Sequence, residues 1–301
     1  MDIVKTFEKE GIACHVHEPM RLHTSFKTGG PAEIFLLPDS AAKLAKAVEI
    51  CRVENKKYYV IGKGSNLLVS DEGVRGIVIS TEAMNKVTED NGCLSADAGA
   101  GLTLLAIKAL EAGMGGFEFA YGIPGSVGGA VVMNAGAYGG EIKDILKSVT
   151  VLDPGGNILT LDPSELDLSY RHSNIEEKGY IVLSALFAGE KAYPAAVKQK
   201  MDENMAARKA KQPLEYPSAG STFKRPEGHF AGRLIEDAGL KGFGVGGAQV
   251  SEKHAGFVIN KGSATTSDIE KLIGIIKEKV YANSRVELEC EVKRLGSAEN
   301  K

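Results

Sequence analysis

Two glycine clusters are the parts of the sequence whose residue types indicate ligand chemistry most directly. The first follows the apolar run 58–61 and reads Gly-Lys-Gly-Ser-Asn over residues 62–66. Because glycine lacks a Cβ, successive backbone N–H groups there can converge on an anion such as a pyrophosphate. The cluster does not fit the dinucleotide fingerprint G-x-G-x-x-G, since Leu67 stands where a glycine is required, and it is not a P-loop. Taken alone, it is more typical of a tight turn between strands.

The second cluster changes that interpretation. Residues 119–140 are uncharged and contain seven glycines and Pro124. Their length approaches that of a membrane helix, but a lipid-exposed helix of this composition would be broken. We predict a buried or ligand-facing loop system with room for a flat ligand, and close packing of the backbone is the alternative. Together, the two clusters predict an extended dinucleotide lying between two small structural units.

Metal and disulfide chemistry are not indicated by the cysteines. Cys14, Cys51, Cys93 and Cys290 lie far apart, with no C-x-x-C pair and no paired histidine spacing. We therefore predict no metal site and free thiols in a reducing compartment. The first 30 residues carry charges throughout and have no apolar core of a signal peptide, so we expect a cytoplasmic protein.

Composition limits the possible classes further. The 301 residues are 43% hydrophobic and 25% charged, which is ordinary for a folded globular protein and excludes a disordered chain or a membrane protein. Lys and Arg total 36 against 39 Asp and Glu, and 36 − 39 = −3 leaves no excess positive charge for a nucleic-acid backbone. Glycine is the unusual residue, at 36 of 301.

The elements that must position the glycine clusters follow from hydrophobic periodicity. In the first part we expect a small unit that contains a β-α-β motif, with a short amphipathic helix at its start. A second helix begins at Asp39 or Ser40 and continues to Glu54. The expected strands are 14–17, 32–37, 58–62, 67–69 and 76–79.

Strands dominate the middle of the chain, and helices return near its end. The sequence Asp-Pro-Gly-Gly at 153–156 predicts a hairpin between strands 148–152 and 157–161. Further strands are expected at 85–89, 94–98, 180–187, 248–250, 256–259 and 286–293. Helices are expected at 103–112, 197–211, 229–238 and 266–281, and a domain boundary is plausible near 190–213.

Seven segments carry a recognisable pattern, in one order along nearly the whole chain. They are HTSFKTGGPAEIF (23–35), VIGKGSNLLVSDEGVRGIVI (60–79), GFEFAYGIPGSVGGAVVMNAGAYGGEI (116–142), YRHS (170–173), PSAGSTFKRP (217–226), LIEDAGLKGFGVGGAQVSEKHAGFVIN (234–260) and LECEVKRLG (288–296). The chain resembles the UDP-N-acetylenolpyruvoylglucosamine reductase (MurB) family in its shorter type II form. The Y-R-x-S, A-G-S-x-F-K and E-x-E-V pieces are the most specific.

The resemblance implies an α+β fold: a two-subdomain FAD-binding domain of the vanillyl-alcohol-oxidase (PCMH) type plus a smaller α+β substrate domain. We predict the FAD-binding subdomains at 1–82 and 83–195 and the substrate-binding domain at 196–301. The implied cofactors are noncovalent FAD and NADPH as reductant. The implied reaction reduces UDP-N-acetylglucosamine enolpyruvate to UDP-N-acetylmuramate for peptidoglycan and the cell wall, by hydride transfer from reduced FAD to C3 and protonation at C2.

Three catalytic residues follow from the same resemblance. Ser221 matches the family's proton donor, while Arg171 and Glu291 match the positions that polarise and protonate the enolate. Such a reaction needs cations or acids at the developing charge. Without the resemblance, Ser221 is typical of a glycine turn, Arg171 of a surface ion pair and Glu291 of the solvated face of a strand. The family often has proline where Cys290 stands, a departure that affects strand geometry more than chemistry.

The remaining site residues are predicted contacts of cofactor and substrate. The flavin contacts, mostly through backbone, are Gly62, Lys63, Gly64, Ser65, Asn66, Gly122, Gly125, Ser126, Gly128 and Asn134. The substrate contacts are Tyr170, Lys211, Arg225 and His254. Lys211 and Arg225 match positions that hold a phosphate or carboxylate in relatives, although a lysine at a helix C-terminus also complements the helix dipole. His254 can also be explained by hydrogen-bonded packing.

Two other functions are compatible with the glycine clusters alone. One is an FAD-linked oxidase or dehydrogenase of 2-hydroxy acids, and the other is a flavin- or nucleotide-sugar-binding module without catalysis. For the reductase, the expected partners are the UDP-sugar substrate and NADPH, with no nucleic acid, no membrane and no obligate protein partner. The choice of NADPH comes from the resemblance, because no nicotinamide-binding fingerprint is present.

Overall fold

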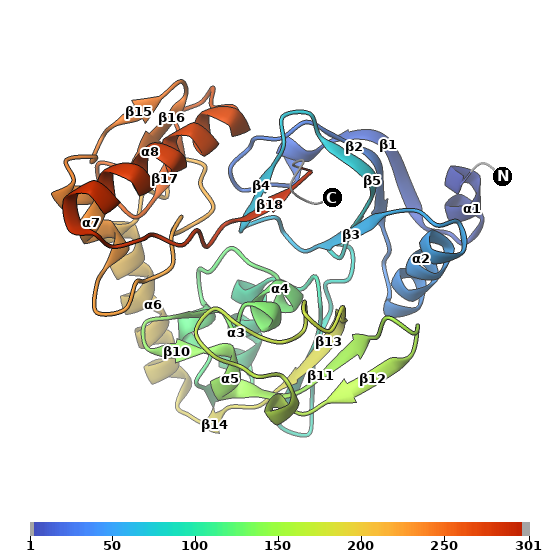
Figure 1. Ribbon diagram of the computed structural model, residues 1–301. Helices are drawn as coiled ribbons and strands as arrows, with labels where there is room; N and C mark the ends of the chain where they lie inside the picture. Colours follow the sequence, from blue (N-terminus) through green and yellow to red (C-terminus); the bar gives the residue numbers. More distant parts are fainter. Residues whose placement is uncertain (1–2, 297–301) are drawn as a thin grey trace. The chain divides into compact units, whose positions relative to one another are not determined.

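The computed structural model describes residues 3–296, and the chain divides into two compact units (Figure 1). Unit 1 comprises residues 3–15, Ile34–Lys63 and Gly76–Ala207, and unit 2 comprises Val16–Glu33, Gly64–Arg75 and 208–296. Each unit is therefore built from stretches that are remote in sequence. Unit 1 contains most of both predicted FAD-binding subdomains and unit 2 most of the predicted substrate domain; the three sequential boundaries stay a prediction.

A four-stranded sheet and two helices form the first layer of the fold. The strand order is β1 (Ala13–Pro19), β2 (Pro31–Leu37), β5 (Val74–Ser80) and β3 (Tyr58–Ile61), with β3 and β5 parallel. Helix α1 (Ile3–Lys9) and helix α2 (Ala41–Val53) pack apolar side chains into the core of this sheet. Ser40 is the N-cap of α2 as predicted, and its Oγ accepts the N–H of Lys43 at 3.4 Å. Residues 44, 47, 48 and 51 of α2 are buried at helical spacing, as the periodicity indicated.

An antiparallel sheet of five strands forms the rest of the core of unit 1. Its order is β12 (Ile158–Leu161), β11 (Leu146–Leu152), β13 (Ile181–Phe187), β7 (Cys93–Asp97) and β6 (Val87–Asp90). The predicted β11–β12 hairpin is confirmed, and Asp153 closes it by accepting the N–H of Asn157 at 2.7 Å. Helix α3 (Leu102–Glu111) contributes Leu102 and Leu105 to the same core. The shorter elements of this unit are β8 (Met114–Gly115), η2 (Glu118–Ala120), η3 (Pro163–Glu165) and β14 (Glu190–Lys191).

The second glycine cluster is more regular than predicted. We expected loops, but residues Val127–Val132 form helix α4, followed by the small β9–β10 pair (Gly136–Ala137 and Gly140–Glu141) and helix α5 (Ile142–Ile145). Val127, Ala130 and Val131 lie on one face of α4 and are buried. Because tertiary packing supplies most of a short helix's stability, this apolar face outweighs the low helix propensity of the glycines.

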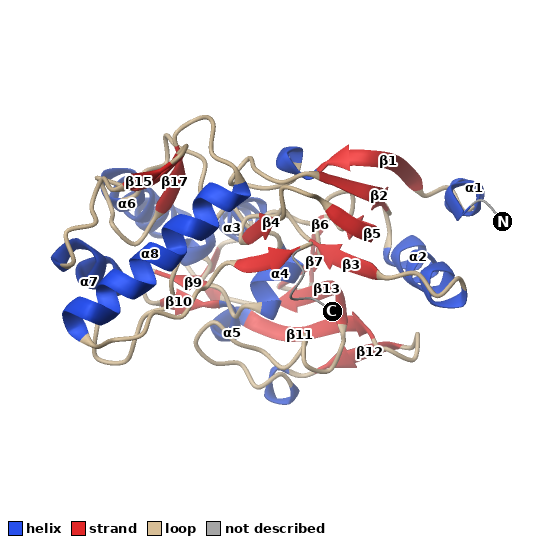
Figure 2. Ribbon diagram, turned by 45° about the horizontal axis from the view of Figure 1, so that its top comes forward, coloured by secondary structure: helices blue, strands red, loops and turns tan. Residues whose placement is uncertain are grey.

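Unit 2 is centred on the long helix α8 (Thr266–Ser284), which lies along the sheet β15 (Gly244–Val245), β16 (Ala248–Val250) and β17 (Val258–Asn260) (Figure 2). The buried side chains of α8 include Ile269, Leu272, Ile273, Ile276 and Val280, a spacing that forms one apolar stripe. Burial of each such side chain stabilises the fold by roughly 1.5–3 kcal/mol. Helix α7 (Ala231–Asp237), the turn η1 (Met20–Leu22) and the parallel pair β4 (Leu67–Val69) and β18 (Lys293–Leu295) complete the unit.

The predicted strand 286–293 is wrong for most of its length. In the structure, β18 begins only at Lys293, and the preceding segment makes an isolated bridge between Cys290 and Phe223. Leu288 and Val292 are the buried residues of this segment, whereas Cys290 and Glu291 are both half-buried. The even-numbered residues from 286 to 292 are buried or half-buried and residues 287, 289 and 293 are exposed, so the expected alternation holds without a continuous strand, and Glu291 departs from it by being half-buried.

Helix α6 (Pro194–Lys211) leads from the last strands of unit 1 to the first residues of the 208–296 stretch. Among the helices of residues 3–296, none is both long enough and apolar enough to cross a membrane.

Candidate active site

The two glycine clusters meet inside unit 1. A Cβ on Gly62 would overlap the Oγ of Ser126, so glycine at position 62 allows the present close approach of the two residues. The second cluster is in turn fixed to the connection between β7 and α3: the N–H of Gly128 donates to the Ala98 carbonyl at 2.7 Å, and the N–H of Val127 to the Ala100 carbonyl at 2.8 Å. Gly62, Ser126 and Gly128, all predicted flavin contacts, are thus brought together.

A cavity of about 570 Å³ lies in the same region of unit 1. Its polar wall includes Lys63, Glu82, Asn85 and Thr103, and its apolar wall includes Leu102 and Ile123. The volume falls within the usual range for a small-molecule site. Lys63 and Gly125 were both predicted as flavin contacts, and both line this cavity.

The composition of the cavity fits part of an FAD molecule. Lys63 is a cation that could hold a phosphate, and its ammonium lies near Gly101, where a Cβ would be 2.8 Å from Nζ. The apolar residues Leu102, Ile123 and Pro124 provide a surface for a flat ring. Gly122 is anchored beside the cavity, because its N–H donates to the Thr103 hydroxyl at 3.2 Å. The residues present therefore fit the cofactor that the sequence predicted.

The other half of the first cluster belongs to unit 2. Gly64 has φ +58° and its carbonyl accepts the N–H of Ser25 at 3.2 Å. Asn66 donates from Nδ2 to the Glu291 carbonyl at 3.0 Å, and its own carbonyl accepts the N–H of Lys293 at 2.9 Å. Asn66, predicted as a flavin contact, therefore also fixes the backbone of a predicted catalytic residue.

Ser221 and Glu291, 70 positions apart in the sequence, are brought together in unit 2 by Thr222. Thr222 is fully buried, and its carbonyl accepts the N–H of Glu291 at 2.9 Å. On its other side, the N–H of Thr222 donates to the Gly256 carbonyl at 2.9 Å, and its hydroxyl accepts the N–H of Val258 at 3.0 Å. The adjacent Ser221 is exposed. The exposed Ser221 and the half-buried Glu291 thus lie on adjoining backbone segments that are fixed through Thr222.

The segment around Glu291 continues this pairing. The N–H of Lys224 donates to the Glu289 carbonyl at 2.9 Å, and the two side chains form an ion pair. The Sγ of Cys290 lies 3.4 Å from the Thr222 carbonyl. Burial raises the pKa of the Cys290 thiol, so this cysteine is a weakly reactive packing residue. All four cysteines are free, as predicted.

Arg171 belongs to unit 1, where it occupies the middle of a short turn with φ +54°. Its guanidinium donates to the Gly136 carbonyl at 3.3 Å and lies 5.1 Å from the centre of the Tyr170 ring. Tyr170 is itself 53% exposed. Arg171, a predicted catalytic residue, and Tyr170, a predicted substrate contact, therefore form a cation–π pair.

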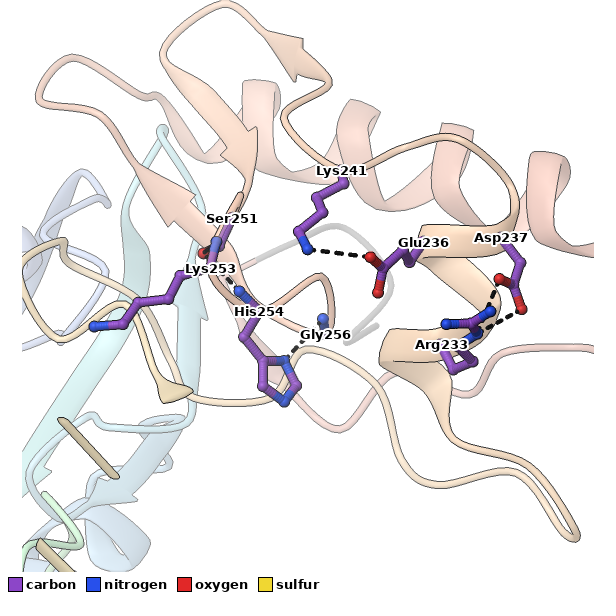
Figure 3. Close-up of polar contacts among 8 residues, drawn as sticks. All are labelled: Arg233, Glu236, Asp237, Lys241, Ser251, Lys253, His254 and Gly256. Carbon is purple, nitrogen blue, oxygen red and sulfur yellow. Dashed lines mark hydrogen bonds and ion pairs between the residues drawn. The ribbon is translucent and has the colours of Figure 1, made fainter. Parts of the chain in front are cut away.

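His254 lies between β16 and β17 in a well-defined hydrogen-bonded turn (Figure 3). Its Nδ1 accepts the N–H of Gly256 at 3.1 Å, its own N–H donates to the Ser251 hydroxyl at 3.2 Å, and its ring packs edge-on to Phe257. Because Nδ1 is an acceptor, Nε2 carries the proton of the neutral ring. Burial lowers the pKa of His254, so the ring is an uncharged donor near neutral pH.

The remaining predicted substrate contacts are two exposed cations. Lys211 is the last residue of α6, and the Arg225 guanidinium lies 4.5 Å from the centre of the Phe230 ring. Thr222 was missed by sequence reasoning, although its place inside the A-G-S-x-F-K piece was a usable signal. Within residues 3–296, no cluster of His, Cys, Asp or Glu is arranged to hold a metal ion.

Comparison with known proteins gives two domain matches. Residues 32–162 match a family described as FAD binding domain, and residues 212–295 match the C-terminal domain of UDP-N-acetylenolpyruvoylglucosamine reductase. The chain is 53% identical over 277 residues to a protein of that name from Clostridium novyi, covering 92% of this chain and 90% of the relative. The namesake from Agathobacter rectalis is 54% identical over 292 residues, covering 93% of each chain.

Solved structures agree with these matches. The crystal structure of the Thermus caldophilus reductase (MurB) has a TM-score of 0.81 and 35% identity, covering 94% of this chain and 98% of that one. The glucose dehydrogenase Phl p 4.0202, with a TM-score of 0.50 and 16% identity over 64% of this chain and 45% of its own, shares the fold alone. The predicted fold class, a PCMH-type FAD-binding domain with a further α+β part, is confirmed. The chain belongs to the UDP-N-acetylenolpyruvoylglucosamine reductase family.

Proposed function

We propose that this chain reduces UDP-N-acetylglucosamine enolpyruvate to UDP-N-acetylmuramate with electrons from NADPH, and that Arg171, Ser221 and Glu291 are its catalytic residues. Membership of the reductase family supports the reaction. The observation that carries the residue assignment is the Thr222 carbonyl bond to Glu291, which holds the exposed Ser221 and the Glu291 carboxylate on adjoining backbone.

The chain's residues divide the work of the reaction. Lys63 and the glycine segments around Gly62 and Gly125 would hold FAD through a cation and backbone N–H groups. When bound, FAD supplies hydride transfer between NADPH and C3 of the substrate. Hydride addition develops negative charge on the substrate carboxylate and C2, which the Arg171 guanidinium stabilises.

Protonation at C2 is assigned to Ser221, with Glu291 as the second acid of the site. A serine hydroxyl is a poor acid in water, so neighbouring cations such as Lys211 or Arg225 assist it. His254, with a proton on Nε2 and no charge, suits a hydrogen bond to a substrate phosphate oxygen. Tyr170 is assigned to substrate binding beside Arg171.

Spectroscopy of the two half-reactions tests the function. The purified protein should bind FAD, lose its yellow colour on anaerobic addition of NADPH and regain it on addition of the enolpyruvyl nucleotide. A Ser221→Ala variant should be reduced by NADPH at the normal rate and reoxidised about 10²–10⁴-fold more slowly. A 2-hydroxy-acid dehydrogenase would be reduced by its acid and would not need Ser221, and a binding module would not turn over. Either result would overturn the proposal.

The setting of the reaction follows from its substrate. We assign the protein to the cytoplasm and to peptidoglycan synthesis. This synthesis builds the cell wall, which is needed for cell division and cell shape. UDP-sugar and NADPH are the partners that this chemistry requires. Independence from nucleic acid, membrane and an obligate protein partner is part of the proposal, and size-exclusion chromatography of the active holoenzyme in a cell extract tests it.

A further inference from the structure

Asn134 lies at the end of α4 and is completely buried. Its Nδ2 donates to the Glu141 carboxylate at 2.9 Å and to the Ser169 carbonyl at 3.0 Å, and its Oδ1 accepts the N–H of Lys143 at 3.0 Å. Both side-chain donors are therefore used by protein groups, which leaves the amide no N–H for the flavin contact that the sequence predicted for Asn134. Asn134 also has φ +39°, a region that asparagine tolerates better than most residues.

The Ser169 carbonyl that Asn134 holds is one end of the turn that carries Arg171. Ser169 and His172 exchange two backbone hydrogen bonds of 3.2 Å each, with Arg171 between them at φ +54°. At the other end of the turn, the Ser173 hydroxyl donates to the Val132 carbonyl at 2.7 Å. The turn is thus tied at one end to Val132, the last residue of α4, and at the other to Asn134, two residues beyond the helix.

The Arg171 side chain rests on the same segment. Its guanidinium donates to the Gly136 carbonyl, two residues after Asn134. A left-handed conformation on arginine is unfavourable and persists only where surrounding contacts fix it. Releasing the Ser169 carbonyl would let the turn relax and move the guanidinium away from its position.

We propose that Asn134 is a positioning residue for Arg171, acting through the Ser169 carbonyl. The proposal rests on the catalytic role proposed above for Arg171. A catalytic group must be held within about 0.5 Å of its productive position, and a displacement of about 1 Å can cost on the order of 10²-fold in rate. Asn134 has no role as an acid, a base or a charge in this arrangement; it fixes where the cation stands.

The amide is specifically required at this position. Aspartate has the same shape, but it offers no donor to the Ser169 carbonyl and would place a second carboxylate beside that of Glu141. Alanine removes both donors and so releases the Ser169 carbonyl from Asn134, while the Ser169–His172 and Ser173–Val132 hydrogen bonds can still form. Asn134→Ala is therefore the direct test, and Asn134→Asp should show the same defect at least as strongly.

The experiment measures FAD affinity and both half-reactions of the holoenzyme. In Asn134→Ala, FAD affinity and the rate of flavin reduction by NADPH should stay within about twofold of wild type, while reoxidation by the enolpyruvyl nucleotide should slow by about 10–10²-fold. The matched control is Asn174→Ala, because Asn174 Nδ2 donates to the Glu165 carbonyl at 2.9 Å in the same loop without touching the turn. This control should reoxidise at the wild-type rate.

A double-mutant cycle separates positioning from general stability. If Asn134 acts through Arg171, adding Asn134→Ala to Arg171→Ala should change the reoxidation rate by less than about twofold. Full additivity of the two defects would overturn the proposal, as would a loss of FAD affinity in Asn134→Ala with normal reoxidation. Should Asn134→Ala not accumulate as a folded protein, Ser173→Ala releases the other end of the turn and should show the same non-additivity. A normal reoxidation rate in Arg171→Ala itself would instead refute the role of Arg171.

Discussion

The backbone of Glu291 is held by two other segments of unit 2, one at Thr222 and one at Asn66. Its N–H donates to Thr222 and its carbonyl accepts from Asn66, and neither contact involves the carboxylate. This arrangement lets substitutions at position 291 report on chemistry. It also explains how an acid can occupy an irregular segment without depending on strand pairing.

Replacing Glu291 by Gln tests that chemistry. The amide keeps the size of the side chain but cannot act as an acid, so reoxidation of reduced enzyme by the enolpyruvyl nucleotide should slow by about 10²–10⁴-fold. Flavin reduction by NADPH should be unchanged. The matched control is Glu289→Gln two residues earlier, which loses only the exposed ion pair with Lys224, worth about 0–1 kcal/mol. Stopped-flow absorbance measures both rates, and equal slowing in the two variants would contradict the assignment.

His254 makes stability depend on pH in a defined direction. Burial lowers its pKa from the ordinary 6.5, so the unfolded state binds the proton more readily than the folded state. The contribution of the neutral ring is complete above pH 6.5 and is lost as pH falls through the lower folded pKa. His254→Asn keeps an acceptor near Gly256 without a titrating ring. Urea unfolding should therefore show a smaller loss of stability between pH 7.5 and 5.5 in the variant; an equal loss would exclude the effect.

At the scale of elements, the structure confirms the parts of the sequence where one signal dominates. Helices α2 and α8 have both an apolar stripe and a side-chain cap, at Ser40 and Thr265, and their predicted starts are correct within two residues. The β11–β12 hairpin contains Asp-Pro-Gly-Gly at 153–156, residue types that strongly favour a turn over a helix or a strand. In each case local sequence and tertiary packing favour the same answer.

Predictions failed where packing outweighs local preference. Helix α4 has a glycine-rich sequence, and only the buried contacts of Val127 and Val131 make it helical. Residues 286–292 have a strand-like composition, but their partners are single residues of the 222–224 segment. The candidate site depends on such pairings between remote segments. The family motifs identified Ser221 and Glu291, whereas the Thr222 bond that joins them could not be read from the sequence.

Gly64 offers a test of one such remote contact. Its φ of +58° would cost an alanine about 1–2 kcal/mol, and the added Cβ would overlap the backbone carbonyl of His23. Gly92 has φ +75° and open space around it, so an alanine there bears only the cost of the left-handed backbone conformation. Chemical denaturation should show a loss of about 1–2 kcal/mol for Gly92→Ala and at least about 3 kcal/mol for Gly64→Ala. Equal losses would mean that the loop moves freely away from His23.

At the scale of the whole molecule, the cofactor is expected to be a major source of stability. A ligand that binds only the folded state at a concentration 100 times its Kd stabilises that state by about 2.7 kcal/mol. The melting temperature of the protein should therefore keep rising with FAD concentration, even after every site is filled. A melting temperature that stops rising at one equivalent of FAD would contradict this model, in which free FAD stabilises only the folded state.

Lys63 should contribute much of the affinity for FAD, because its cation lies in the wall of the unit 1 cavity. Lys63→Gln should weaken FAD binding by roughly tenfold or more, the cost of losing a hydrogen bond to a charged group. Lys56→Gln, an exposed lysine seven residues earlier, is the matched control and should bind FAD normally. Fluorescence titration of the apoprotein measures both affinities. Normal binding by Lys63→Gln would place the phosphates elsewhere.

The pairing of β4 with β18 joins residue 69 to residue 295. During translation, β4 leaves the ribosome long before its parallel neighbour exists. At roughly 5–20 residues per second, the delay is about 11–45 s. For that interval the apolar residues of β4 lack their partner strand, so this part of unit 2 is completed only after residue 295 has been synthesised.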